Sequence, residues 1–298
     1  MDNYVVSTCT SGDITEEFLK SRNIECVCFH YELDGKQYMD DFGKTISYPD
    51  LYDAMVKGAD TKTTQVNQYE YEEFFGKFLA EGRDIIHIAL SSGISGSYNS
   101  AKLAAEALKE KYPDRKIYVV DSLNASSGQG LLADAVADRR DEGMSIDDAY
   151  KWVEEVKLNY HAWFFTTDLT FFIRGGRVSK ASGFIGGVLN ICPLLNIDYK
   201  GCLIPRDKIR TKKKVIAATV DKMIELADNG KEYVGKCYVS HSDCYEDARE
   251  TADLVEETFP ALKGKVYITD IGTTIGSHTG PGTVALFFVG AKRVKESD

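Results

Sequence analysis

The sequence predicts an α/β protein of two domains, and three observations lead to this fold class. The chain of 298 residues is too long for one average domain and long enough for two. In its first half, short β-branched segments alternate with amphipathic helical patterns, which is typical of a parallel sheet covered by helices on both faces. The alternation starts again after about residue 165. We therefore expect an N-terminal α/β domain over residues 1–165 and a mixed α/β domain over residues 166–298.

The elements of the first half follow from hydrophobic periodicity. Unbroken apolar runs of four to six residues predict buried strands, and apolar residues that recur every three to four positions predict helices. The expected strands are Tyr4–Val6, Ile85–Leu90 and Ile117–Val120, and the expected helices cover 69–81, 98–111, 125–141 and 145–159.

The second half contains the same two kinds of pattern. We expect strands at 191–197, 237–240, 266–269 and 284–289, and helices at 212–228 and 243–259. Pro193 lies inside the first of these strands and cannot donate a backbone hydrogen bond, so it predicts either an edge strand or a strand that begins near the proline. No Pro- or Ser-rich linker separates the halves, and we therefore expect the domains to pack closely.

Composition and charge exclude several classes of protein. With 43% hydrophobic and 28% charged residues the chain is predicted to be neither disordered nor membrane-embedded, and its net charge of -10 argues against general binding to nucleic acid. The longest apolar stretch, residues 183–197, is too short to span a bilayer. Seven cysteines, and an opening sequence that lacks basic and apolar leader regions, indicate the reducing cytoplasm. Cys26 and Cys28 have no second pair at zinc spacing, so we expect no metal site.

A serine- and glycine-rich segment over residues 91–97 lies between a predicted strand and a predicted helix. Such a turn presents backbone N–H groups and hydroxyls to an anion. One serine would be enough to cap the helix, and four serines with two glycines favour an anion site. The segment lacks the G-x-S-x-G spacing of a nucleophile elbow and the lysine of a P-loop.

Three further polar segments stand at predicted element boundaries. Residues 61–65 carry three threonines in what reads as a polar loop, where hydroxyls would donate to a carboxylate. Arg174 and Arg177 flank two glycines and suit bidentate binding of a carboxylate or phosphate, with further cationic charge at 210–214. His278 lies at the centre of a glycine-rich segment over 276–282, which reads as a loop that approaches a ligand closely.

Apolar residues surround the arginine segment in the sequence, at 171–173 and 184–195. An apolar cavity with a few convergent polar groups is what a lipid site requires. Each buried CH₂ group contributes about 0.8 kcal/mol, so a long alkyl chain would supply the affinity and the polar groups the orientation. The residues alone do not choose a fatty acid over another small anion.

These segments, in this order, resemble the DegV family of bacterial fatty-acid-binding proteins over essentially the whole chain. The resemblance lies in the serine turn at 92–98, in Val120–Ser122 followed by the segment 128–130, in Gly175–Arg177 and in His278–Gly282. One departure is at 63–67, where Thr-Thr-Gln-Val-Asn stands in place of the family's T-S-Q-P-S.

The resemblance implies a two-domain α/β fold with a long-chain fatty acid such as palmitate in the cleft between the domains, and no other cofactor. The carboxylate would meet hydroxyls and the cationic or imidazole groups of Thr63, Thr64, Ser92, Ser95, Arg210 and His278. Arg174 and Arg177 would provide a second anion or partner contact. The chain would then not be an enzyme by itself; it would present the acid to a separate fatty acid kinase that forms an acyl phosphate for phospholipid synthesis.

Two enzymatic hypotheses remain open from the residues. A serine hydrolase would use Ser95 as nucleophile, His278 as base and Asp121 or Asp270 to orient the base. A stand-alone phosphotransferase would need a nucleotide-binding motif, and the sequence shows no Walker motif, kinase glycine loop or convincing Rossmann fingerprint.

Overall fold

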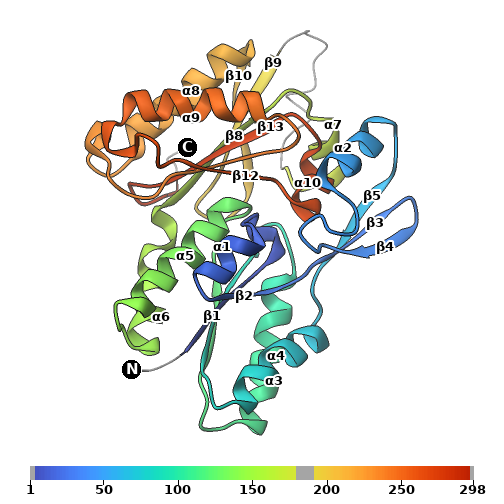
Figure 1. The fold of residues 1–298 in the computed structure, drawn as a ribbon, viewed down its shortest axis with the longest axis vertical. Helices are drawn as coiled ribbons and strands as arrows, with labels where there is room; N and C mark the ends of the chain where they lie inside the picture. Colours follow the sequence, from blue (N-terminus) through green and yellow to red (C-terminus); the bar gives the residue numbers. More distant parts are fainter. Residues whose placement is uncertain (1–3, 179–190, 296–298) are drawn as a thin grey trace.

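The computed structural model describes residues 4–178 and 191–295. Its strands form three sheets, which lie in the lower, upper and right-hand parts of the view in Figure 1. The described chain is a mixed α/β protein with one wholly parallel sheet, as the alternation predicted.

The parallel sheet occupies the N-terminal half and has the strand order β2-β1-β6-β7. Its strands are β1 (Val5–Cys9), β2 (Ile24–Val27), β6 (Ile85–Ala89) and β7 (Ile117–Asp121). Two helix pairs cover its two faces: α3 (Gln68–Ala80) with α4 (Ser97–Lys111), and α5 (Ser127–Asp141) with α6 (Ile146–Val156). The short α1 (Glu16–Ser21) packs beside β2. Every residue of β1 and β6 is buried, which explains their unbroken apolar sequences.

A mixed sheet of six strands forms the C-terminal half, in the order β10-β9-β8-β13-β11-β12. Its strands are β8 (Tyr160–Thr166), β9 (Ile191–Ile197), β10 (Leu203–Arg210), β11 (Tyr238–His241), β12 (Tyr267–Asp270) and β13 (Thr283–Val289). Helices α8 (Lys212–Leu226) and α9 (Tyr245–Thr258) cover one face. Helix α5 contacts strands of both large sheets and therefore lies between them.

The third sheet is small, antiparallel and ordered β4-β3-β5, with β3 (His30–Leu33), β4 (Lys36–Met39) and β5 (Thr61–Thr64). Beside it lie α2 (Tyr48–Val56), α7 (Thr170–Gly175) and α10 (Thr273–Thr279). Short 3₁₀ turns complete the secondary structure at Thr10–Gly12, Lys157–Asn159, Gly230–Glu232 and Pro260–Leu262.

Local sequence sets where several helices begin. Asn67 caps α3 by accepting from the Glu70 N–H, while the Glu70 side chain accepts from the Asn67 N–H. Ser47, Ser145 and Thr15 cap α2, α6 and α1 in the same way with their hydroxyl oxygens. Such caps satisfy backbone donors that have no partner inside the helix, and each contributes about 1 kcal/mol.

Three expectations about local structure need correction. The strand with Pro193 is not an edge strand, because β9 lies between β10 and β8; the proline is tolerated because the β8 pairing begins at Leu194. Residues 61–64 form strand β5 rather than a loop, since they pair with β3. His278 lies in the last turn of helix α10 and not in a loop.

The expected division of the chain at residues 165 and 166 stays a prediction. Strand β8, which begins at Tyr160, belongs to the six-stranded sheet. Among residues 4–178 and 191–295, none of the helices is both long and apolar enough to cross a bilayer.

Candidate functional site

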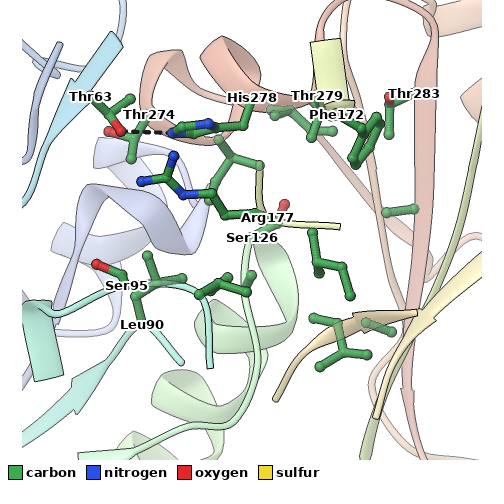
Figure 2. A pocket seen from close by; sticks show the side chains of 18 of the residues that line it. Thr63, Leu90, Ser95, Ser126, Phe172, Arg177, Thr274, His278, Thr279 and Thr283 are labelled. Atoms are coloured by element: carbon green, nitrogen blue, oxygen red, sulfur yellow. Dashed lines mark hydrogen bonds between the residues drawn. The ribbon is translucent and has the colours of Figure 1, made fainter. Parts of the chain in front are cut away.

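A cavity of about 550 Å³ lies where the three sheets meet, and most of its lining is apolar (Figure 2). Its walls come from the carboxyl ends of the parallel strands, from β8, β9 and β13, and from α7 and α10. The apolar lining residues are Phe29, Leu90, Ile94, Ala125, Ala162, Phe164, Phe172, Ile197, Leu203, Ile271, Ile275, Ala285 and Phe287. A volume of this size is typical of small-molecule sites in proteins.

Several polar groups of the cavity lie on one side of it, whereas Thr279 and Thr283 lie toward the other side in Figure 2. His278 Nε2 lies 2.7 Å from the Thr63 hydroxyl oxygen, and this hydrogen bond joins α10 to β5. The guanidinium of Arg177 extends beside them, and the hydroxyl of Ser95 lies on the same side of the view in Figure 2. Two hydroxyls, an imidazole and a guanidinium therefore converge, which is a set of donors suited to an oxyanion.

His278 is a neutral imidazole at neutral pH. Burial and, to a smaller extent, the positive charge of Arg177 together lower its pKa to about 4. Its Nδ1 atom is buried and has no hydrogen-bond partner among the described residues. The neutral ring forms a hydrogen bond through Nε2 with the Thr63 hydroxyl and so helps to hold that hydroxyl in place. Arg177 supplies the positive charge on this side of the cavity.

Helix α10 is held by two buried carboxylates at its N-terminal end. Asp13 accepts from the Gly272 N–H at 2.9 Å, and Asp40 accepts from both the N–H and the hydroxyl of Thr274, the latter at 2.6 Å. Burial raises the pKa of both carboxyl groups, and these hydrogen bonds oppose that rise. A helix of only seven residues is weak by itself, so these contacts and that of the Tyr52 hydroxyl with the Ile271 carbonyl fix the position of His278.

Two glycines permit the close approach of the segments that carry Arg177 and His278. A side chain at Gly175 would lie 2.6 Å from His278 Nδ1, so the end of α7 contacts the histidine directly. Gly280 has a φ of +67°, and a side chain there would lie 2.1 Å from the Phe171 ring. The glycines of the two sequence motifs are thus required by packing between α7 and α10.

The serine turn contacts the hairpin between β9 and β10. The Ser91 hydroxyl donates to the Gly201 carbonyl at 2.9 Å and accepts from the Gly93 N–H at 3.1 Å. Ser95 Oγ accepts from the Ser97 N–H at 3.2 Å, which leaves the Ser95 hydroxyl hydrogen for a ligand. The N-cap residue of α4 is Gly96, which has no side chain to cap the helix, and Ser95 instead accepts from the N–H of the first helical residue.

A buried network supports the serine turn from the core of the N-terminal half. The Tyr71 hydroxyl lies 2.7 Å from the Ser97 hydroxyl and 3.2 Å from Cys9 Sγ, and His87 connects Cys9 with Ser7. Burial raises the pKa of the Cys9 thiol to about 12, so this cysteine is neutral and unreactive. The network holds the serine turn in position through hydrogen bonds and contains no reactive thiolate.

The structure brings together five of the eight expected site residues. Thr63, Thr64, Ser95, Arg177 and His278 line the cavity.

The other three expected residues lie outside the cavity lining. Ser92 is an exposed residue of the serine turn whose N–H donates to Asp121. Arg174 is exposed, with its guanidinium 5.6 Å from the centre of the Phe171 ring. Arg210 is exposed at the end of β10, opposite Ile191. The apolar residues expected at 184–190 lie outside the described residues.

Sequence reasoning missed five polar residues of the lining: Gln65, Ser126, Thr274, Thr279 and Thr283. Ser126 had a usable signal, because it follows β7 as the serine turn follows β6, and ligands of parallel sheets bind at the carboxyl ends of strands. The Ser126 hydroxyl donates to Asp13 and so links the cavity wall to the anchor of α10. Gln65 and Thr279 lie in the polar segments 61–65 and 276–282 that the sequence had already indicated, whereas Thr274 and Thr283 had no such signal.

The parts of a hydrolase triad are not assembled among the described residues. His278 hydrogen-bonds Thr63 and not Ser95, Asp121 accepts from the Ser92 and Leu123 N–H groups, and Asp270 lies 3.6 Å from His241. The same described ranges contain no group of three or more His, Cys, Asp or Glu side chains arranged for a metal ion.

The fold and the cavity define a class of protein: a mixed α/β protein with a mainly apolar cavity that also carries hydroxyl, imidazole and guanidinium groups. A family model described as "Uncharacterised protein, DegV family" matches residues 5–291. This chain belongs to the DegV family.

Proteins that are similar to this chain in sequence or in structure match it over nearly its full length. A DegV domain-containing protein of Clostridium perfringens is 34% identical over 97% of this chain and 98% of its own length. The structure of DegV, a fatty-acid-binding protein from Bacillus subtilis, matches with a TM-score of 0.81 at 27% identity, over 98% of this chain and all of that one. A Thermotoga maritima protein, described as revealing a fatty-acid-binding function, matches with a TM-score of 0.83 at 25% identity over the same shares.

Proposed function

We propose that this chain binds one long-chain fatty acid in the cavity, with the alkyl chain among the apolar residues and the carboxylate at Thr63, Ser95, Arg177 and His278. The observation that carries the proposal is a mainly apolar lining with Thr63, Ser95, Arg177 and His278 on one side of the cavity. The fatty-acid-binding DegV proteins of B. subtilis and T. maritima share the fold over their whole length. Each buried CH₂ group would contribute about 0.8 kcal/mol to binding.

The roles on this side of the cavity follow from charge and geometry. Arg177 supplies the positive charge, while the hydroxyls of Thr63 and Ser95 and the neutral ring of His278 fix the direction of the carboxylate. Arg210 and Arg174, both exposed and outside the lining, would then act on a partner rather than on the carboxylate.

Calorimetric titration of the delipidated protein with palmitate tests the site. The serine turn offers a matched pair, because Ser95 lines the cavity and Ser92 does not. We expect Ser95→Ala and His278→Ala to weaken binding about tenfold, the effect of one lost hydrogen bond to a charged group, and Ser92→Ala to leave it unchanged. Equal affinities of all three variants and the original protein would count against the assignment.

The second part of the proposal is that the bound acid is presented to a separate fatty acid kinase, which forms the acyl phosphate. The support is the family resemblance together with the absence of an assembled catalytic triad among the described residues. The purified chain with ATP and palmitate should form no acyl phosphate unless a kinase protein is added. ATP turnover by the chain alone would overturn this part and leave the binding proposal untouched.

A further inference from the structure

A second cavity, of about 560 Å³, lies on the other side of β8 from the fatty-acid cavity. Successive residues of a strand point to opposite faces of its sheet. Ala162 and Phe164 line the first cavity, and His161 and Trp163 line the second. The walls of this second cavity, called here the C-terminal groove, are His161, Trp163, Asn196–Lys200, Ile204, Arg206, Lys222, Glu225, Leu226 and Ala291–Lys295.

The C-terminal groove concentrates positive charge in a protein that is acidic overall. Among residues 4–178 and 191–295, six cationic side chains line it, against two acidic ones, Asp198 and Glu225. Asp198 is engaged in its own turn, where Oδ1 accepts from the N–H groups of Lys200 and Cys202, and Glu225 is paired with Lys222 at 2.7 Å. The formal excess is therefore four positive charges, against -10 for the whole chain.

One of these cations is a buried arginine whose charge is not neutralised by direct contact. Arg293 is only 7% exposed, and all of the acceptors described for its guanidinium are backbone carbonyl oxygens, among them those of Leu123, Ile197 and Asp198. Burial lowers its pKa to about 10, which leaves it protonated at neutral pH. The nearby Asp198 carboxylate opposes this lowering, but the described hydrogen-bond acceptors of the guanidinium are all backbone dipoles, which favours an anion in the adjacent space.

A spare donor lies in the same wall. Trp163 is 6% exposed, and its indole N–H has no acceptor among the described residues. A buried donor without a partner carries a desolvation cost that an acceptor from a ligand would remove. The ammonium of Lys222 lies 5.3 Å from the centre of the Trp163 ring, so the indole also responds to the charge state of the groove.

We propose that the C-terminal groove binds a small polyanion that carries at least two phosphate groups. Several cationic side chains distributed around one groove match a ligand with separated negative charges better than a single carboxylate. The phosphate oxygens would meet the ammonium groups of Lys200, Lys222, Lys292 and Lys295, in the field of Arg293. This site is separate from the fatty-acid cavity, and its existence does not depend on the proposed function.

Trp163 provides a direct probe, because the sequence contains only two tryptophans. The other, Trp152, lies on α6 with Arg139 over its ring, so Trp152→Phe leaves Trp163 as the sole indole. Inorganic pyrophosphate is titrated into this variant at constant ionic strength, with potassium chloride as the control salt. The fluorescence emission of Trp163 is recorded during the titration. Calorimetry under the same conditions detects binding that leaves this fluorescence unchanged.

We expect a saturable response to pyrophosphate that chloride does not reproduce. The double substitution Lys200→Gln and Lys292→Gln should raise the dissociation constant at least about tenfold. The control pair is Lys57→Gln with Lys109→Gln, two exposed lysines on other elements with the same change in net charge, and it should leave the constant unchanged. No saturable binding by either method, or equal weakening by both pairs, would overturn the proposal.

Discussion

The fatty-acid cavity and the C-terminal groove have nearly equal volumes and share strand β8, yet their linings have opposite character. The first is walled mainly by aliphatic and aromatic side chains, with one arginine and a neutral histidine on one side. The second combines lysines and arginines with apolar side chains such as Trp163, Ile204 and Leu226. The comparison teaches that cavities of similar size on the two faces of one strand can differ in charge, because the cations of the second come from the β9–β10 hairpin, from α8 and from residues 292–295 rather than from β8.

Filling one cavity and not the other should have the largest effect. Ala162→Phe places a ring in the fatty-acid cavity, and Ala291→Phe places the same ring at the C-terminal groove. We expect the first variant to lose at least about nine-tenths of its bound palmitate, because the ring occupies the space of several CH₂ groups, and the second to retain it. Titration calorimetry gives the affinities, and circular dichroism checks that both variants fold.

If both variants retained palmitate, the alkyl chain would not occupy the cavity beside β8. If both lost it equally, the two cavities would not be independent.

Removing the cation of the fatty-acid cavity should have the next largest effect. Arg177→Gln should weaken palmitate binding about tenfold to a hundredfold, the range for a hydrogen bond between charged groups, while Arg174→Gln should change it little. Because the interaction is with a carboxylate, hexadecanol should bind the Arg177 variant and the original protein equally. A similar loss for the alcohol would mean that Arg177 acts through the fold.

The two cavities each contain a buried histidine, and ligand binding should distinguish them. Burial lowers the pKa of both His278 and His161 to about 4. Palmitate should raise the pKa of His278, because a nearby carboxylate favours the protonated ring. It should leave the pKa of His161 unchanged, because this ring lies in the other cavity, where its Nε2 forms a hydrogen bond with the Ala291 carbonyl oxygen. Proton NMR titration of the loaded and delipidated forms measures both values; equal shifts would contradict the expected carboxylate position.

The same two histidines set a pH dependence of stability. An unfolded histidine has a pKa of about 6.5, above the folded values, so the unfolded chain takes up protons first as the pH falls. The contribution of these two rings to the free energy of unfolding should therefore decrease between about pH 6.5 and pH 4. His87, whose pKa burial lowers to about 3, acts in the same direction, whereas Asp13 and Asp40, whose pKa values burial raises, act in the opposite one. Urea unfolding at a series of pH values should show a shallower decrease for His278→Gln than for the original protein.

The smallest expected effect concerns a polar atom in the apolar part of the fatty-acid cavity. Thr283 lines this cavity, and its buried hydroxyl has no hydrogen-bond partner among the described residues. Thr283→Val keeps the shape and removes that group, so palmitate affinity should stay equal or rise by up to about 1 kcal/mol. Weaker binding by this variant would show that the hydroxyl contacts the ligand.

The sequence predicted three of the four strands of the parallel sheet, missing β2, and predicted the local structure around His278 poorly, for a physical reason. The apolar runs of β1, β6 and β7 report burial on both faces, which is a local property of the sequence. Helix α10 is short and glycine-containing, and it exists because Asp13 and Asp40, more than 230 residues away, bind its first turn. Contacts at that separation leave no periodic signal.

The arginines also show that local sequence patterns do not predict which side chains reach the cavity. Arg174, Arg177 and Arg210 all stand in polar sequence beside predicted elements, and nothing local separates them. The left-handed turn at Gly176 ends α7 and brings Arg177 to the cavity, whereas the register of β10 leaves Arg210 outside it. Only the three-dimensional path of the chain selects among them.

The most direct test of the central claim is denaturing mass spectrometry of lipid extracted from the purified recombinant chain, with the protein quantified in the same sample. The account predicts about one fatty acid of long chain length per protein molecule, because the described lining has one arginine for one carboxylate. It also predicts that Ala162→Phe loses this lipid while Ala291→Phe keeps it. A protein that carries no fatty acid and takes up none from added palmitate would contradict the account.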